Sequence, residues 1–348
     1  MDAREGSFVF NVVWTGTSFE GLQYFVSSQL AQSRARFRFV VNGCPPEQVA
    51  ALEAYRARHP HRVVEVLDVS TEMIAHGQAL DLVREVRDDG EWFCLIDPDI
   101  KVNAPFVGDL AAVLDDADVV TSGKEVWSTT NVLPEGYWGV AGEYFYDRDG
   151  FVFGSPHLAI YRRSVLDEVC ERWDVGMGSA GPELSDAARA HLAGIGREFK
   201  VYDTAKIVNC LLQADGHRLV HREFDQLVHI GGLAHYLSPA FYLTDEQGEE
   251  VPEWTRWDNM GDRHRVARFT AQVLRGQLAG EPVPAIPPGL DPSMEERLAL
   301  ARDEVVDLIA RYRHGPGPEA GDGSAPAAAQ APAPGGDRRR GWRRFLGR

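Results

Sequence analysis

The sequence predicts an α/β fold in which a mostly parallel sheet is flanked by helices. Short apolar runs rich in β-branched residues alternate with helix-like segments over the first 100 residues, a pattern typical of a parallel sheet. Several of these runs end in glycine, asparagine or aspartate, the turn residues expected where a buried strand stops. The chain is also long enough: it has 348 residues, 44% hydrophobic and 25% charged, as in ordinary globular proteins.

The first 100 residues contain four expected strands and three expected helices. The strands are residues 8–14, 37–43, 62–69 and 91–97, each a short apolar run. The first helix begins at about residue 18, the second spans 45–60 with prolines in its first turn, and the third spans about 77–87.

Beyond residue 100 the pattern is less regular. Residues 118–123 are expected to form a strand, 135–157 loops and short antiparallel strands, and 157–173 a strand followed by a helix. Further helices are expected at 182–192, about 262–278 and 293–314. In the last of these, Ser293 and Glu296 fit a capping box and the apolar residues form a stripe. We expect this helix to pack on the domain; docking to a partner is the alternative.

These segments divide the chain into three parts. Residues 1–240 form the main α/β domain, 241–314 a mixed and helical C-terminal extension, and 315–348 a low-complexity segment expected to be disordered. This last segment carries a charge of +3 out of a total of −16, so the rest of the chain has −19. Its basic end, RRRGWRRFLGR, is expected to be a solvated tail, with weak contact to an anionic membrane as the alternative.

Charge and composition exclude several classes of protein. A body with a charge of −19 lacks the basic face that nucleic-acid binding requires. No apolar run reaches the roughly 18–20 residues of a membrane-spanning helix, and the first residues do not resemble a secretory signal. The four cysteines are scattered and are expected to be reduced. We therefore expect a cytoplasmic protein, peripheral to the inner membrane face only if the basic end binds there.

Polar residues follow three of the expected strands. Thr15 and Gly16 follow the first, Asn42 ends the second, and the Asp97-Pro98-Asp99 segment ends the fourth. Ligands of parallel sheets bind beyond the carboxyl ends of the strands. These residues are therefore expected to line a site.

Asp97 and Asp99 are the sharpest feature of the sequence. Two carboxylates separated by one residue on extended backbone point to the same side and can hold a hard divalent cation, although Asp-Pro-Asp is also ordinary turn chemistry. His229 follows an apolar pair and precedes two glycines, which suits a histidine at a strand end. One imidazole and two carboxylates form a reasonable ligand set for manganese or magnesium. His235, six residues further on, is a rival.

Six segments resemble, in order and spacing, the motifs of a known family. They are VVNGC, HGQALD, FCLIDPD, GSPHLAIYRRSVLDEV, PELSDAARAHLAGIG and VHIGG. Together they are similar to those of the GT-A glycosyltransferases, family-2-like enzymes that use nucleotide sugars and carry a DxD motif. The resemblance covers about residues 8–240 and implies a GT-A, Rossmann-like fold.

The resemblance also implies an activity and a donor. A sugar would pass from a UDP- or GDP-sugar to an acceptor hydroxyl, with Asp99 bridging the diphosphate to Mn²⁺ or Mg²⁺, Asp97 nearer the ribose or sugar, and His229 at the metal. Residues 8–123 would bind the nucleotide sugar, and 124–240 would form the acceptor side. The nucleotide-lining residues would be Thr15, Gly16, Asn42, Gly77 and Asp97.

The segment PELSDAARAHLAGIG suggests the catalytic base. Setting Arg189 and Gly194 on the family's Arg and Gly places Glu183 where the catalytic Asp stands, with Asp186 one turn on as the alternative. An inverting transfer is slightly favoured; if neither carboxylate is the base, a retaining transfer becomes plausible. Further aromatic residues are candidates for sugar stacking or an acceptor pocket: Tyr137, Trp138, Tyr144, Trp254 and Trp257.

Two departures from the family pattern matter. Asn42 stands where many relatives have an Asp that reads the base, so the base stays open between UDP and GDP. The usual Glu-Asp pair is replaced by Pro182-Glu183.

Two other classes remain as alternatives. One is a GT-A-like scaffold or nucleotide-sugar-binding protein without catalysis. The other is a sugar nucleotidyltransferase, which ranks last because TGTSFEG after the first strand has no Lys or Arg to hold a triphosphate. The acceptor, whether a sugar, a lipid or another small molecule, is not specified by the sequence.

Overall fold

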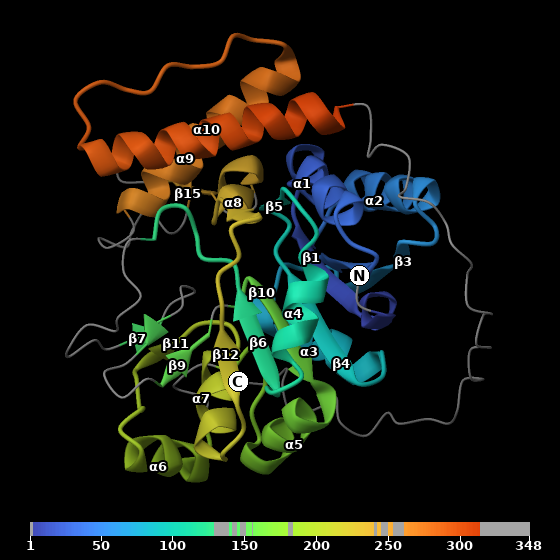
Figure 1. The fold of residues 1–348 in the computed structure, drawn as a ribbon, viewed down its shortest axis with the longest axis vertical. Helices are drawn as coiled ribbons and strands as arrows, with labels where there is room; N and C mark the ends of the chain where they lie inside the picture. The colour runs from blue at the N-terminus through green and yellow to red at the C-terminus, as the bar shows by residue number, and fades with distance from the viewer. Residues whose placement is uncertain are drawn as a thin grey trace. The chain divides into compact units, whose positions relative to one another are not determined.

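A seven-stranded sheet forms the centre of the chain in the computed structural model (Figure 1). The structure describes residues 3–128, 139–140, 145–146, 151–154, 156–179, 184–239, 242–244, 250–252 and 261–313. The sheet order is β12-β6-β10-β4-β1-β2-β3. Its strands are β1 (Val9–Thr15), β2 (Arg36–Asn42), β3 (Val63–Ser70), β4 (Trp92–Ile96), β6 (Val119–Ser122), β10 (Leu158–Arg162) and β12 (Leu219–His221).

The sheet is parallel except for one strand. β1 pairs in parallel with β2 and β4, and β2 with β3. β10 runs antiparallel to both of its neighbours, β4 and β6, while β12 is parallel to β6. The predicted class, an α/β fold with a mostly parallel sheet, is therefore confirmed.

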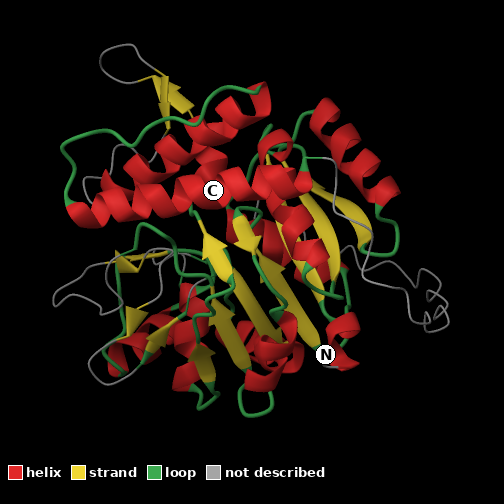
Figure 2. Cartoon of the chain, turned by 45° about the horizontal axis from the view of Figure 1, so that its top comes forward, coloured by secondary structure: helices red, strands yellow, loops and turns green. Residues whose placement is uncertain are grey.

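The central strands are apolar on both sides because helices cover both faces of the sheet (Figure 2). Along β1, Phe10, Val12 and Trp14 belong to one core cluster, while Val13 belongs to the other. This alternation follows from the two-residue period of a strand. It explains why these strands appear in the sequence as continuous apolar runs.

Each face has its own helices. The first core cluster contains residues of α1 (Phe19–Ala31), α2 (Pro46–Arg58) and α4 (Val107–Val113). The second contains residues of α3 (His76–Val86), α5 (Arg163–Trp173), α6 (Asp186–Gly194) and α7 (Lys206–Ala214).

Two long helices complete the first face. α9 (Gly261–Ala279) and α10 (Pro292–Tyr312) lie together across the top of the view in Figure 1, and their buried residues join the same core cluster as α1. The prediction that the last helix packs on the domain is thus confirmed. Its cap differs from the prediction: the Asp291 side chain, and not that of Ser293, accepts a hydrogen bond from the Met294 N–H at 3.0 Å.

Short elements occupy the connections. β5 (Ile100–Val102) and β13 (Leu227–His229) form an antiparallel pair beyond β4, and α8 (Leu233–Leu237) follows β13. The remaining elements are η1 (Ala3–Ser7), β7 (Gly139–Val140), β8 (Phe145–Tyr146), β9 (Val152–Phe153), β11 (Val201–Tyr202), β14 (Tyr242–Thr244) and β15 (Glu250–Pro252).

The helix expected from residue 182 begins later, at Asp186, because Ser185 caps it by accepting from the Ala188 N–H at 3.2 Å. Glu183 lies outside the described residues, as do the proposed stacking aromatics and the basic tail. Among the described residues, no helix is long and apolar enough to cross a membrane.

Candidate functional site

The Asp97-Pro98-Asp99 segment is a tight connection between β4 and β5. Its backbone is held from two sides. The Asp97 N–H donates to the carbonyl of His157 at 2.7 Å, and the buried Gln29 side chain of α1 donates to the carbonyls of Asp97 (3.0 Å) and Ile100 (2.9 Å). Contacts with α1 and with His157 therefore fix the backbone from which the two carboxylates project.

His229 reaches these carboxylates from a distant part of the sequence. β13 pairs with β5 so that His229 lies opposite Ile100. The His229 Nε2 atom is 3.1 Å from Asp99 Oδ1 and 3.8 Å from Asp97 Oδ2. The structure thus brings together the three side chains that were predicted to form a metal site.

The two glycines after His229 shape this contact. Gly231 and Gly232 both have positive φ angles, 76° and 78°, which an L side chain rarely adopts. The turn they form directs the N–H of Leu233 to Asp99 Oδ2 at 3.0 Å. Asp99, which is only 4% exposed, is thereby held by backbone on one oxygen and faces His229 with the other.

The hydrogen bonds of His229 define which of its nitrogens faces the aspartates. The Nδ1 atom lies 2.7 Å from the carbonyl of Gly123, and a carbonyl only accepts, so Nδ1 carries a hydrogen. In the neutral ring, Nε2 then presents a lone pair toward Asp99 Oδ1. Two acceptors at this distance need a proton or a metal ion between them.

Charges at the site shift the pKa values in a consistent direction. Burial works against ionisation of Asp99, but the charge and hydrogen bond of His229, with the Leu233 N–H and the charge of His157, together outweigh it and hold the pKa of Asp99 well below its usual range. Burial and the charge of His157 work against protonation of His229, yet the charge and hydrogen bond of Asp99, with the charge of Glu125, together raise its pKa. The pocket therefore stabilises anionic carboxylates around a positive centre.

His157 and Glu125 are parts of the site that sequence reasoning missed. His157 directly precedes β10; its Nδ1 lies 2.8 Å from Asp97 Oδ2 and its Nε2 lies 2.5 Å from Glu125 Oε1. Burial opposes the charge of His157, but the two carboxylates raise its pKa to about 10. The pKa of Glu125, despite burial, falls to about 2 beside this cation.

Within the described part of the chain, one group of three residues offers ligand atoms that all lie within 4.8 Å of one another: Asp97, His157 and His229. His76, at the start of α3, is more distant, with its Nε2 3.9 Å from Asp97 Oδ1. The rival His235 lies on α8 outside this group, and burial together with Arg263 lowers its pKa to about 3.

Thr15 and Gly16 lie at the same edge of the sheet as Asp97, because β1 and β4 are parallel neighbours. Gly16 has a positive φ of 53°. The following residue, Thr17, donates its N–H to the side chain of Ser238 at 3.1 Å, which ties this loop to the segment after α8. The position of Thr15 and Gly16 is compatible with the predicted nucleotide-lining role.

Asn42 and Gly77, also predicted to line the nucleotide site, both contact the backbone of neighbouring segments. The Asn42 side chain is fully buried: its amide donates to the Ile74 carbonyl at 2.8 Å and accepts from the Ile74 N–H at 2.9 Å. A hydrogen bond to a nucleobase would have to replace one of these. Gly77 packs against backbone, since a Cβ there would lie 2.4 Å from the Met177 carbonyl oxygen.

Asp186 does not join the cluster. It is an exposed first-turn residue of α6, where a carboxylate interacts favourably with the helix dipole. In Figure 1, α6 lies at the bottom of the view, far from β5 and α8 near the top. The described residues therefore offer no support for Asp186 as the base.

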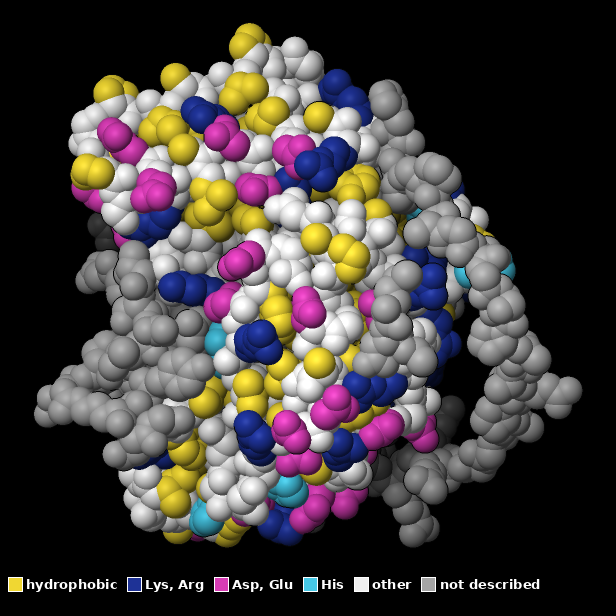
Figure 3. Space-filling view, viewed as in Figure 1, with side chains coloured by type: hydrophobic (Ala, Val, Ile, Leu, Met, Phe, Trp, Pro, Cys, Tyr) yellow, Lys and Arg dark blue, Asp and Glu magenta, His cyan; other side chains and the backbone are white. Residues whose placement is uncertain are grey.

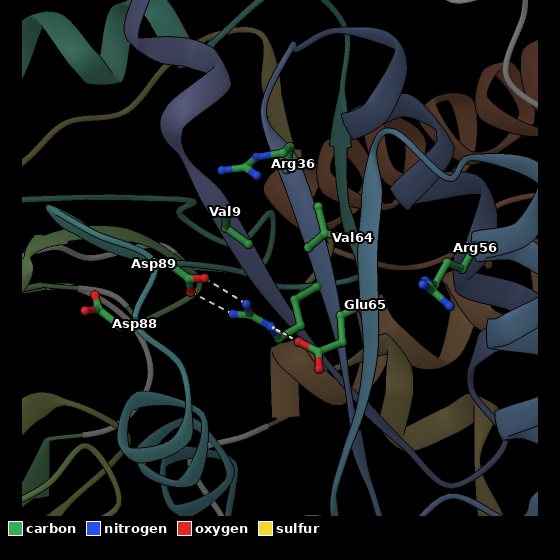
Figure 4. A pocket seen from close by; sticks show the side chains of 8 residues that line it. Val9, Arg36, Arg56, Val64, Glu65, Asp88 and Asp89 are labelled. Atoms are coloured by element: carbon green, nitrogen blue, oxygen red, sulfur yellow. Dashed lines mark hydrogen bonds and ion pairs between the residues drawn. The ribbon is translucent and has the colours of Figure 1, made fainter. Parts of the chain in front are cut away.

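A hollow of about 500 Å³ lies at the opposite edge of the sheet, near the first residues of β1, β2 and β3 (Figure 4). Its charges neutralise one another: the Arg38 guanidinium bonds to Asp89 at 2.7 and 2.8 Å and to Glu65 at 2.9 Å. The dashed lines in Figure 4 end on the carboxylates of Asp89 and Glu65. We interpret the charged side chains that line this hollow as an ion network that stabilises the fold.

One face of the molecule shows how the charges of the described residues are distributed. On the face seen in Figure 3, basic and acidic side chains of the described residues are interspersed, and no basic stripe runs across it. This face offers no track for a phosphate backbone.

No family model and no curated protein matches this chain. Solved structures do resemble it. The chain is similar to the mannosyltransferase PcManGT from Pyrobaculum calidifontis in complex with GDP-Man and Mn²⁺, with 16% identity over 87% of this chain and 74% of that one, and a TM-score of 0.40.

Two further structures are similar at a comparable level. GalNAc-T7 with UDP, GalNAc and Mn²⁺ shows 11% identity over 89% of this chain and 57% of its own, with a TM-score of 0.43. A nucleoside-diphosphate-sugar pyrophosphorylase from Vibrio cholerae RC9 shows 14% identity over 64% and 96%, with a TM-score of 0.39. Glycosyltransferases and a sugar-nucleotide pyrophosphorylase are thus among the solved structures to which this chain is similar.

Proposed function

We propose that this protein is a metal-dependent glycosyltransferase that moves a sugar from a nucleoside-diphosphate sugar to an acceptor hydroxyl. The observation that carries the proposal is the convergence of Asp97, Asp99 and His229, with His229 Nε2 only 3.1 Å from Asp99 Oδ1. These residues are 132 positions apart at the extremes of the set, so local turn chemistry alone does not explain their meeting.

The residues present fit a divalent cation. His229 Nδ1 is committed to the Gly123 carbonyl, which leaves Nε2 as a ligand atom facing two carboxylates. A hydrogen bond of this kind, to the nitrogen that does not face the metal, is the usual way in which a protein orients a histidine ligand. Oxygen and imidazole ligands together suit Mn²⁺ and also permit Mg²⁺. When bound, such an ion neutralises charge that develops on a departing diphosphate.

The chain's own residues supply orientation. Gln29 holds the backbone carbonyl of Asp97, and the Leu233 N–H holds one carboxylate oxygen of Asp99. The two carboxylates therefore need little rearrangement when they bind a charged ligand. Thr15 and Gly16, on the neighbouring strand end, are proposed to line the nucleotide site. UDP and GDP both remain candidates for the leaving group, because Asn42 is engaged with Ile74.

The acceptor side is proposed to lie within residues 124–240, with Glu183 as the base that accepts the hydroxyl proton. A described contact joins this part of the chain to α3. Asp81 Oδ1 and Oδ2 accept hydrogen bonds from the N–H groups of Met177 (2.8 Å) and Gly178 (2.9 Å). These bonds hold the chain at residues 177–178 against α3. The acceptor is proposed to be a sugar, a lipid or another small molecule, in either an inverting or a retaining transfer.

The proposal is tested by turnover. Purified protein is incubated with UDP- and GDP-sugars in the presence of Mn²⁺, and release of free nucleoside diphosphate is followed by chromatography. Slow hydrolysis of at least one donor is expected, since water can replace the acceptor, and Asp99→Asn should abolish it. Nucleotide binding without any turnover would instead favour a non-catalytic nucleotide-sugar-binding protein. Pyrophosphate-dependent formation of a nucleoside triphosphate would favour a nucleotidyltransferase.

A further inference from the structure

We propose that His157 is an additional protein ligand of the cation, that buried Glu125 orients it, and that the resulting two-imidazole site favours Mn²⁺ over Mg²⁺. This inference rests on the proposed function, because it concerns the same ion. It goes further by assigning roles to two residues that were not expected at the metal from the sequence and by choosing between the two metals.

The backbone fixes His157 directly opposite Asp97. In the antiparallel pair of β10 and β4, Leu158 faces Ile96, and the next step along the register is a hydrogen bond from the Asp97 N–H to the His157 carbonyl at 2.7 Å. Opposed residues of an antiparallel pair project to the same side of the sheet. His157 Nδ1 and Asp97 Oδ2 consequently lie only 2.8 Å apart.

His157 also lies beside the other histidine. The ring centroids of His157 and His229 are 4.4 Å apart. Nitrogen atoms of both rings and a carboxylate oxygen of Asp97 fall within the 4.8 Å that ligands of one ion can share. With metal–ligand bonds of about 2.0–2.2 Å, neighbouring ligand atoms of one ion are roughly 3–4 Å apart. The spacing of these atoms is therefore compatible with a common ion.

Glu125 is placed to orient His157. A bridge between Glu125 and His229, with a hydrogen bond from the Val126 N–H to the His229 carbonyl at 2.9 Å, brings this segment beside β13. Glu125 is 3% exposed, and its Oε1 lies 2.5 Å from His157 Nε2. This ion-pair contact holds the Nε2 side of the ring against Glu125 and directs the Nδ1 atom at Asp97, where it can bind a cation in place of its proton.

Close packing holds Glu125 in this position. A Cβ atom at Gly231 would lie 2.7 Å from the Glu125 Cγ and 2.6 Å from the Trp127 Nε1, so the glycine allows these side chains to approach. Glu125 is too deeply buried to take part in an ion pair at the protein surface. Its partner in the structure is the distal nitrogen of a histidine, the arrangement in which a carboxylate raises the basicity of a metal-bound imidazole.

The composition of the ligand set determines the preferred metal. Carboxylate and water ligands suit Mg²⁺, whereas imidazole suits first-row transition metals. A set of Asp97, Asp99, His157 and His229 contains two imidazoles and therefore favours Mn²⁺. In a coordination shell of about six, these four ligands leave about two positions, enough for two oxygens of a diphosphate.

The test compares Mn²⁺ and Mg²⁺ affinities of the full chain by calorimetry, with Mn²⁺ binding also followed by electron paramagnetic resonance. His157→Gln should lower Mn²⁺ affinity at least about 10-fold, while Mg²⁺ affinity changes less because the glutamine offers an oxygen. Glu125→Gln should lower Mn²⁺ affinity by about 10-fold, the low end of the effect of substituting a residue that holds a metal ligand in place. A purely structural role for His157 would not change the ratio of the two affinities.

His76→Gln is the matched control. Its Nε2 also faces Asp97, at 3.9 Å, but its side chain is 35% exposed and lies outside the group of close ligand atoms. Mn²⁺ affinity of this variant should stay within about twofold of the unaltered protein. Thermal melting in EDTA shows whether each variant is folded; if His157→Gln is not, Glu125→Gln decides.

The outcomes separate this inference from the proposed function. Unchanged Mn²⁺ affinity in both His157→Gln and Glu125→Gln, with loss in His229→Gln, would overturn the inference and leave the proposed site intact. Equal losses in the His76 control would also overturn it. Absence of Mn²⁺ binding by the unaltered protein, even with UDP or GDP present, would instead contradict the proposed function itself.

Discussion

Gly77 shows how closely one residue is constrained by its neighbours. A Cβ atom there would lie 2.4 Å from the carbonyl oxygen of Met177 and 2.6 Å from the N–H of Gly178, and backbone cannot move aside as a flexible side chain can. Gly77→Ala is expected to lower the free energy of unfolding by about 1–3 kcal/mol, measured by urea denaturation. Gly194→Ala is the control, since nothing lies within 4 Å of a Cβ there. A loss no larger than the control's would show that the loop yields.

Glu65 makes stability depend on pH. Its hydrogen bonds with Arg87 and Arg38 outweigh the opposing effect of burial and lower its pKa from 4.5 to about 2. A carboxylate with a lowered pKa stabilises the fold above its unfolded pKa, and this contribution is lost as the pH falls from about 4.5 to about 2. Glu65→Gln should therefore cost about 1–2 kcal/mol near neutral pH and progressively less toward pH 2.

Urea denaturation across this pH range measures the effect. The control is Glu53→Gln, which removes an exposed pair with Arg56 at 3.1 Å and should change little at any pH. A stability difference for Glu65→Gln that stays constant with pH would contradict the electrostatic explanation.

At this scale the sequence predicted part of the site. Asp97, Asp99 and His229 were predicted because a strand end followed by aspartates, and a histidine followed by two glycines, are visible locally. His157 and Glu125 were missed because each becomes meaningful only through pairing with a distant strand. The amide of Asn42, which stays a predicted nucleotide-lining residue, holds the Ile74 backbone, a contact that no local pattern indicates.

Among the elements, α10 is tied to β5 by a buried charge. Lys101 is 1% exposed, and its Nζ lies 2.5 Å from Glu304 Oε2 and 2.6 Å from Asp307 Oδ2. Removing both acceptors leaves a buried ammonium without compensation. The double variant Glu304→Gln, Asp307→Asn should lower the free energy of unfolding by about 3 kcal/mol, measured by chemical denaturation.

Adding Lys101→Met to that double variant should recover much of the loss, because no uncompensated charge remains. Asp303→Asn is the control on the same helix, as its pair with Arg302 is 66% exposed on the aspartate side. If the triple variant is no more stable than the double, the cost comes from lost packing and not from the buried charge.

Most elements followed from periodicity and end signals. The first four strands, the three intervening helices and the two C-terminal helices lie within a few residues of the expected ranges. The direction of β10 did not follow from its apolar run, because a buried strand has the same composition whichever way it runs. The cap of α10 was misplaced because both Asp291 and Ser293 are good capping residues, and the position of Pro292 in the first turn favours Asp291.

For the whole molecule, the order of the sheet determines where chemistry takes place. β1 and β4 are parallel neighbours, β10 inserts antiparallel beside β4, and the β5–β13 pair extends beyond β4. Residues as distant in sequence as Asp97 and His229 thus meet at the carboxyl end of β4. The class of this sheet could be predicted from the sequence, whereas the pairing that assembles the site required three-dimensional contacts between distant segments.

The measurement that tests the central claim most directly is calorimetric titration of the protein with UDP and GDP, in Mn²⁺ and in EDTA. We expect one of them to bind in Mn²⁺ and binding to fall at least about 10-fold in EDTA. Asp99→Asn, which is nearly isosteric, should lose the Mn²⁺-dependent binding while keeping its melting temperature in EDTA within a few degrees. Equal binding of either nucleotide by the two proteins, with or without Mn²⁺, would contradict the claim that Asp97, Asp99 and His229 hold a cation that binds a diphosphate.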